Sequence, residues 1–107
     1  MSPEVETASF QIIASVGTAR SNYIEAIDKA AAGDFDAAEA LIAEGEQIFA
    51  TGHNAHFGLI QKEAEGNPSE FALILMHAED QLMSAEGFGV LAKKFVALYR
   101  SLAEKAA

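Results

Sequence analysis

The sequence predicts an all-α protein, an antiparallel three-helix up-down-up bundle. Apolar residues recur every three or four positions in three successive segments, which is the period of a helix with one buried face. Glycine and proline, at Gly33 and in residues 66–68, separate these segments and are typical of helix boundaries. No segment alternates apolar and polar residues as a half-buried strand does. Each predicted helix has about 30 residues and is therefore roughly 45 Å long, and short connections make neighbouring helices antiparallel.

The first predicted helix spans residues 3–32. It begins with Pro3, which is tolerated in a first turn, and Glu4 and Glu6 suit the positive end of the helix dipole. Gly33 follows the last turn, where left-handed backbone is common and glycine adopts it at least cost. The apolar stripe of this helix consists of Val5, Ile12, Val16, Tyr23, Ile27 and Ala30, with Ser9 and Ala19 in the gaps.

The second predicted helix spans residues 36–64, and Asp34 or Asp36 can cap it by accepting hydrogen bonds from its free amides. Its stripe consists of Ala38, Leu41, Gly45, Ile48, Gly52, His56 and Leu59. Each glycine inside a helix costs about 1 kcal/mol relative to alanine, so a compensating gain is expected. The expected gain is the close approach of a neighbouring helix at the three glycines of this segment, Gly45, Gly52 and Gly58.

The third predicted helix spans residues 68–105. Asn67 is a good N-cap, Pro68 fits the first helical position, and Glu70 stands where the side chain of a capping box reaches back. The two glycines of residues 86–89 predict a bend or a local loosening. The helical period resumes beyond them with Leu91, Phe95, Leu98 and Leu102.

Residues 71–85, FALILMHAEDQLMSA, are the most apolar part of the chain and carry His77 and Asp80 three positions apart. Residues at this spacing share one face of a helix. A helix that is apolar all round is normally buried on all sides, so one side of it is expected to pack on its own helices and the other on another subunit. A carboxylate there is costly unless it is paired, metal-bound or protonated. If copies of this helix meet about a symmetry axis, their Asp80 side chains converge and must bind a cation or take up protons.

Spacing alone leaves the role of His77 open. A histidine on an apolar helix can be a buried polar residue satisfied by hydrogen bonds, a metal ligand, or a nucleophile or base. His53 and His56 also stand three apart, and with His77 and Asp80 they could build a metal site in a bundle core. A structural or metal role and a catalytic role are therefore both carried forward.

Composition narrows the function further. A chain of 107 residues suits one domain, residues 1–107, and its net charge of −9 argues against a nucleic-acid partner. The absence of cysteine excludes disulfides, thiolate metal sites and cysteine nucleophiles. There is no phosphate loop of Walker type and no nucleophile elbow. The N-terminus has no signal-peptide pattern and no apolar run approaches the roughly 20 residues that span a bilayer, so a cytoplasmic protein without membrane insertion is expected.

Five motifs line up in order with those of one known family. They are GTARS followed by EA, at residues 17–21 and 25–26; GDF, at 33–35; LIQKEAEG, at 59–66; HAEDQLMSA, at 77–85; and LY, at 98–99. On these motifs, which are spread over roughly the whole chain, the sequence resembles the enzyme IIA components of the lactose/cellobiose class of the bacterial sugar phosphotransferase system.

The resemblance implies that His77 is phosphorylated. It would accept the phosphoryl group from the histidine-containing phosphocarrier protein and pass it to a cysteine of the sugar-specific IIB component. The resemblance also implies a homotrimer of three-helix subunits, which is a nine-helix assembly. Asp80 of all three subunits would then meet one divalent cation, Mg²⁺, on the threefold axis.

The sequence departs from the family pattern beside His77. Glu79 stands where glutamine is usual, and Gln81 stands where a second histidine is usual. In the second helix, His56 and Phe57 replace a glutamine and a threonine. Glu79 is expected to disfavour an anionic phosphoryl group on His77 unless its side chain points away. These departures keep a second hypothesis open: a non-enzymatic helical regulatory or interaction module, a relative that has lost transfer.

Overall fold

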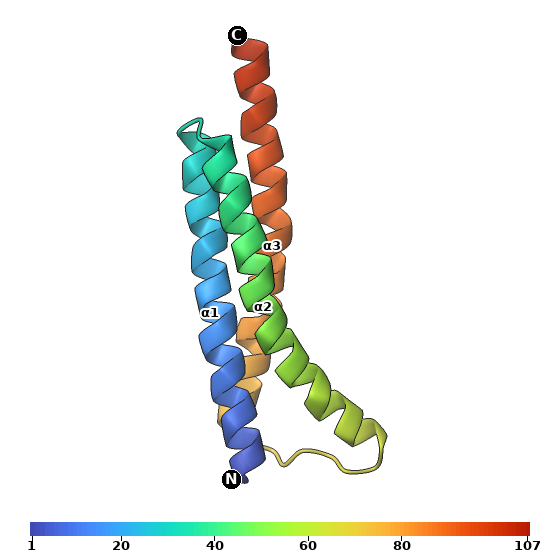
Figure 1. Ribbon diagram of the computed structural model, residues 1–107. Coiled ribbons are helices and arrows are strands. Elements are labelled where there is room, and N and C mark those ends of the chain that lie inside the picture. The colour runs from blue at the N-terminus through green and yellow to red at the C-terminus, as the bar shows by residue number, and fades with distance from the viewer.

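The computed structural model describes all 107 residues as three helices: α1 (Pro3–Ala31), α2 (Phe35–Ala64) and α3 (Leu73–Ala106). The bundle measures 58 × 21 × 19 Å. In Figure 1, α1 and α3 run upward and α2 runs downward, which confirms the up-down-up arrangement. The lower end of α2 splays away from the other two helices, and the chain returns to the start of α3 through a long connection.

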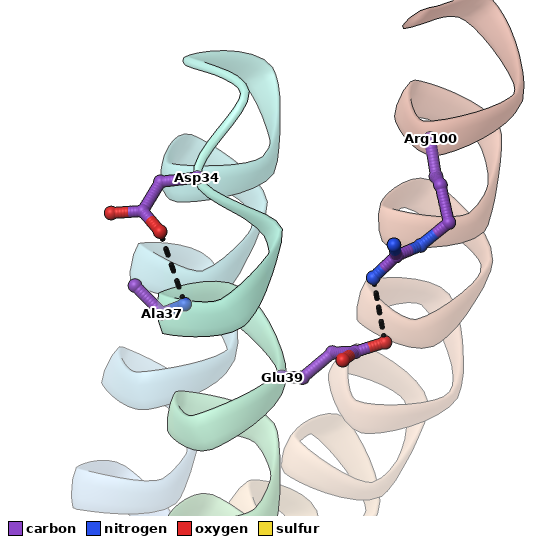
Figure 2. A network of polar contacts seen from close by, with 4 residues as sticks. All are labelled: Asp34, Ala37, Glu39 and Arg100. Atoms are coloured by element: carbon purple, nitrogen blue, oxygen red, sulfur yellow. Dashed lines mark hydrogen bonds and ion pairs between the residues drawn. The ribbon is translucent and has the colours of Figure 1, made fainter. Parts of the chain in front are cut away.

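The boundary between α1 and α2 forms as the sequence predicts. Gly33 has a φ of 85°, the left-handed geometry expected after a helix end. Asp34 is the N-cap of α2, and its carboxylate accepts a hydrogen bond of 3.2 Å from the backbone N–H of Ala37 (Figure 2). Gly66, with a φ of 93°, ends α2 in the same way as Gly33 ends α1.

The start of α3 differs from the prediction. Residues 67–72 form no helix, α3 begins at Leu73, and Glu70 does not reach back to cap Asn67. The Glu70 carboxylate instead accepts a hydrogen bond from the backbone N–H of Ser2, which holds the pKa of Glu70 below its ordinary value. Extended residues span about 3.3 Å each, against 1.5 Å in a helix. An extended connection can therefore bridge the gap left by the splayed end of α2, which one more helical turn cannot.

The predicted bend at residues 86–89 is also wrong, because α3 is a continuous helix through both glycines. Gly89 is buried, and a Cβ atom there would lie 3.0 Å from Cε2 of Tyr23. On the other side of the same ring, a Cβ atom at Gly45 would lie 2.8 Å from Cε1. The Tyr23 side chain of α1, only 3% exposed, thus fills space that α2 and α3 leave by carrying glycine. Close approach is confirmed at Gly45 and also at Gly52, but the expectation is wrong for Gly58, where a Cβ atom would meet nothing within 4 Å.

Replacing Gly45 with alanine is expected to lower the free energy of unfolding by about 1 kcal/mol. Overpacking against a buried ring costs about 1–3 kcal/mol, which exceeds the gain of about 1 kcal/mol in helix propensity. Gly58→Ala is the matched control, since a Cβ atom there meets nothing within 4 Å and the substitution should stabilise by about 1 kcal/mol. Urea unfolding of both variants measures the difference. Equal stabilisation by the two substitutions would contradict the tight packing at Gly45.

Tyr23 also makes stability depend on pH in the alkaline range. Burial raises the pKa of the Tyr23 hydroxyl above 10.0, and the nearby carboxylate of Glu46 raises it further. The neutral side chain is therefore favoured in the folded state. The contribution of the neutral Tyr23 hydroxyl to the free energy of unfolding is fully present below about pH 10. It is lost as the pH rises through the pKa of Tyr23 in the folded state. The free energy of unfolding should fall with pH in this range, and the fall should be smaller in Tyr23→Phe.

Ion pairs join α2 to α3 on the surface of the bundle. Arg100 Nη2 lies 2.9 Å from Glu39 Oε1 (Figure 2), and Lys93 Nζ lies 2.9 Å from Glu46 Oε1. The buried stripe of α3 consists of Leu75, Ala78, Leu82, Ala85, Gly89, Ala92 and Val96. Because this stripe faces α1 and α2, it fixes which side of α3 points away from the bundle.

Candidate functional site

His77 lies on the surface of α3. Its neighbour in sequence, Ala78, belongs to the buried stripe, whereas His77 itself is exposed and makes no side-chain hydrogen bond within the chain. Within one chain, His77 is therefore not a buried histidine satisfied by hydrogen bonds. Both ring nitrogens are free to meet another molecule.

Asp80 is exposed at the centre of the side of α3 that faces away from α1 and α2. At about 100° per residue it lies opposite the buried stripe, and no lysine, arginine or histidine pairs with it. Large apolar side chains lie one turn away on either side of it; Met76 is 48% exposed and Met83 is 69% exposed. We call this surface the outer face of α3: Leu73, Met76, Asp80, Met83, Leu91, Phe95, Leu98 and Leu102. The stretch is thus apolar all round but covered on one side only within the chain.

The four residues of the hypothetical bundle metal site do not come together in one chain. The His53 ring stacks on Phe57, with ring centroids 6.5 Å apart and planes inclined by 6°, and His56 bonds to Glu79. No group of three or more histidine, aspartate or glutamate side chains is arranged to hold a metal ion. A metal at Asp80 would need carboxylates from other copies.

Glu79 points toward α2 and away from His77. Its Oε2 atom lies 2.9 Å from Nε2 of His56. Residues two apart on a helix are separated by about 200° round its axis, so His77 and Glu79 lie on opposite flanks of α3. Within the chain, the Glu79 side chain therefore points away from His77. This is the arrangement in which its negative charge does not oppose a phosphoryl group on His77.

Gln81 points toward α1. Its Oε1 atom accepts a hydrogen bond of 2.6 Å from Nη1 of Arg20, and both side chains are half-buried. Gln81 follows His77 by four residues and shares its side of α3. Sequence reasoning placed Arg20 in a motif but gave it no role. Arg20 and Gln81 are 61 residues apart, and no local periodicity relates them.

None of the three helices combines the length and the apolar character needed to cross a membrane.

A family model described as the lactose/cellobiose-specific IIA subunit of the PTS system matches residues 7–100. The chain is similar to the oligo-beta-mannoside-specific EIIA component of the PTS system of Bacillus subtilis (strain 168), with 43% identity over 96 residues, 90% of this chain and 87% of the relative. It is also similar to the lactose-specific EIIA component of Staphylococcus aureus (strain N315), with 39% identity over 97 residues, 91% of this chain and 94% of the relative.

The fold has a solved counterpart. The crystal structure of the PTS cellobiose-specific enzyme IIA from Bacillus anthracis superposes with a TM-score of 0.93 at 34% sequence identity. The superposition covers 98% of this chain and 96% of that one. The three-helix arrangement as a whole therefore has a counterpart in an experimental structure.

Proposed function

Because the chain belongs to the lactose/cellobiose-specific IIA subunit family of the phosphotransferase system, we propose that it carries a phosphoryl group during sugar uptake and that His77 is the residue phosphorylated. The observation that carries this proposal is the exposed, unbonded ring of His77 on α3. Of the other two histidines, His56 bonds to Glu79, and His53 is exposed but its ring lies against those of Phe49 and Phe57. His77 is thus the histidine whose ring makes neither a hydrogen bond nor an aromatic contact within the chain.

The transfer consists of two displacements at phosphorus. In the first, the lone pair of an unprotonated nitrogen of His77 attacks the phosphorus carried by the phosphocarrier histidine. The donor N–P bond breaks, and its electron pair stays on the donor imidazole. In the second, the thiolate of a IIB cysteine attacks the same phosphorus, and the N–P bond to His77 breaks. The first step requires the neutral imidazole, because its attacking lone pair is lost on protonation.

Such a transfer asks little covalent chemistry of this chain. Positioning of the reacting atoms and neutralisation of charge supply most of the rate. An exposed histidine on a rigid helix suits this task, because the donor and the acceptor must reach the same nitrogen in turn. The direction of Glu79, away from His77, favours the carrier over the alternative of a transfer-deficient regulatory module.

The outer face of α3 supports a homotrimer. Seven of the eight residues of this face are large apolar side chains exposed on one helix, and an exposed apolar patch of this kind marks an interaction surface. Three copies that pack these faces about a threefold axis would bury the patch and form a nine-helix assembly. The same packing would bring three Asp80 side chains together at the axis.

Asp80 fits a shared metal ion. It has no cationic partner in the chain and stands in the middle of an apolar surface. Three converging carboxylates need a cation, and Mg²⁺ prefers oxygen ligands. When bound, the ion would neutralise the carboxylates and so stabilise the assembly. Asp80 of each copy would hold it, and His77 would carry out the transfer.

We place this chain, with the phosphocarrier protein that supplies it, in the cytoplasm. The test of the carrier function is the intact mass of the chain after incubation with enzyme I, the phosphocarrier protein and phosphoenolpyruvate. We expect a gain of one acid-labile phosphoryl group per chain, which is lost again when a matching IIB component is added. A folded chain that gains no mass would overturn the proposal and favour the regulatory module.

A further inference from the structure

One guanidinium group lies beside the helical turn that carries His77. Arg20 Nη1 donates a hydrogen bond of 2.6 Å to Gln81 Oε1. Residues four apart on a helix have Cβ atoms about 5–6 Å from each other, so this bond holds the guanidinium close to the His77 side chain. A guanidinium has five N–H donors, and one bond to an amide leaves the others for a further ligand.

The charge of Arg20 is not offset by a carboxylate. Lys62, Lys93 and Arg100 each form an ion pair with a glutamate, whereas the partner of Arg20 is a neutral amide. The chain has a net charge of −9, and a phosphoryl group adds up to about two more negative charges. A group of this kind needs a cation close by.

The other lysines without a carboxylate partner lie too far from His77 to serve. Lys94 follows His77 on the same helix by 17 residues, or roughly 25 Å at 1.5 Å per residue, and Lys105 lies farther still. Lys29 is nine residues beyond Arg20 on α1, roughly 13 Å along the helix, at the end away from His77. Arg20 is thus the lysine or arginine of this chain best placed to meet a group on His77.

Arg20 reaches this turn of α3 from farther along the bundle. The two helices run in the same direction (Figure 1), and a Cβ atom at Gly89 of α3 would lie 3.0 Å from the ring of Tyr23 of α1, so residues about 66 positions apart lie level. In this register the backbone of Arg20 lies level with the turn after Gln81, whereas its side chain bonds to Gln81 itself. The Arg20 side chain therefore runs back along α3 in the direction of His77.

We propose that Arg20 binds the phosphoryl group while it is on His77, and that Gln81 is a positioning residue that holds the guanidinium in place. This inference rests on the proposed function. Guanidinium groups bind phosphate oxygens through paired N–H donors, and such charge-assisted bonds are stronger than neutral ones. Arg20 stabilises the phosphorylated form relative to the free histidine and so raises the share of phosphoryl groups held by this protein.

The test uses the full chain and its Arg20→Gln variant, phosphorylated by enzyme I and the phosphocarrier protein. Two quantities are measured: the equilibrium ratio of phosphorylated to free protein against the phosphocarrier, and the pH midpoint of the ³¹P signal of the phosphohistidine. Arg20→Gln should lower the equilibrium ratio by about tenfold to a hundredfold, the effect of one hydrogen bond to a charged group. The ³¹P midpoint should rise, because a nearby cation favours the dianion.

Three further variants separate this role from a structural one. Arg20→Lys keeps the charge but not the planar fork, and should recover part of the equilibrium ratio. Gln81→Glu keeps a partner for Arg20 but neutralises its charge, so it should shift the equilibrium ratio and the ³¹P midpoint as Arg20→Gln does. This variant tests the proposal even if Arg20→Gln folds poorly. Arg100→Gln removes an equal charge from the remote pair with Glu39, and should leave both quantities unchanged.

The possible failures are distinguishable. If the unaltered protein is phosphorylated, and Arg20→Gln and Gln81→Glu show the same equilibrium ratio and the same ³¹P midpoint as the unaltered protein, the role of Arg20 is overturned and the carrier function stands. A variant with less folded protein by circular dichroism but an unchanged ³¹P midpoint would also overturn it. If the unaltered protein accepts no phosphoryl group, the proposed function itself fails and this inference fails with it.

Discussion

His77→Ala is expected to abolish phosphorylation of the chain while leaving its helices and its assembly intact. The imidazole nitrogen is the atom that bonds to phosphorus, so its removal should reduce the mass gain from one phosphoryl group to none. The side chain is exposed and unbonded, and surface substitutions of this kind usually change the free energy of unfolding by about 0.5 kcal/mol or less. Intact mass, circular dichroism and sedimentation of the same sample measure all three properties.

The controls are the other two histidines. His53→Ala and His56→Ala should keep the mass gain, because their rings are engaged with Phe57 and Glu79 and neither is the proposed acceptor. If His77→Ala still gained an acid-labile phosphoryl group, while one of these two variants lost it, the acceptor would have been misassigned.

Leu98→Lys is expected to convert the proposed trimer into single chains. Leu98 lies 18 residues after Asp80, five full turns, and therefore on the same line of the outer face. In the trimer three ammonium groups would meet near the axis, and these cannot share a metal ion. Burying one unpaired charge costs on the order of several kcal/mol. Three such charges should dissociate the assembly at micromolar concentration, as measured by sedimentation velocity.

Asp80→Leu is the matched substitution on the same line, and its expected result is the opposite. It replaces three converging carboxylates with apolar side chains, so the trimer should persist or strengthen. Binding of Mg²⁺ should disappear in the variant. A chelator should therefore change the sedimentation of the unaltered protein but not that of Asp80→Leu. A monomeric Asp80→Leu, or a trimeric Leu98→Lys, would show that the outer face of α3 is not the subunit interface.

The local sequence determined most of the helical framework. The apolar period and the end signals at Asp34 and Gly33 predict α1 and α2 to within a residue, because each signal acts within one or two turns of the chain. Helix geometry alone also places His77 and Asp80 on neighbouring lines of α3, with Glu79 on the far flank from His77. The exposed apolar side of α3 follows from the same periodicity.

Only the tertiary structure decided where α3 begins and that it is unbroken. The local signal at Asn67 and Pro68 is that of a helix start, but Glu70 bonds to Ser2 at the far end of the sequence. The glycines of residues 86–89 weaken a helix locally, yet Gly89 packs on the ring of Tyr23 and α3 continues past it. In both places a contact between distant residues outweighs a local preference.

The surroundings of His77 were decided in the same way. The residue types at positions 79 and 81 show a departure from the family, but not where the side chains go. Glu79 meets His56 of α2, and Gln81 meets Arg20 of α1. The sequence of a helix determines the order of its side chains round the axis. Which residue of another helix each side chain meets depends on how the three helices pack, and this cannot be inferred from the residues of one helix alone.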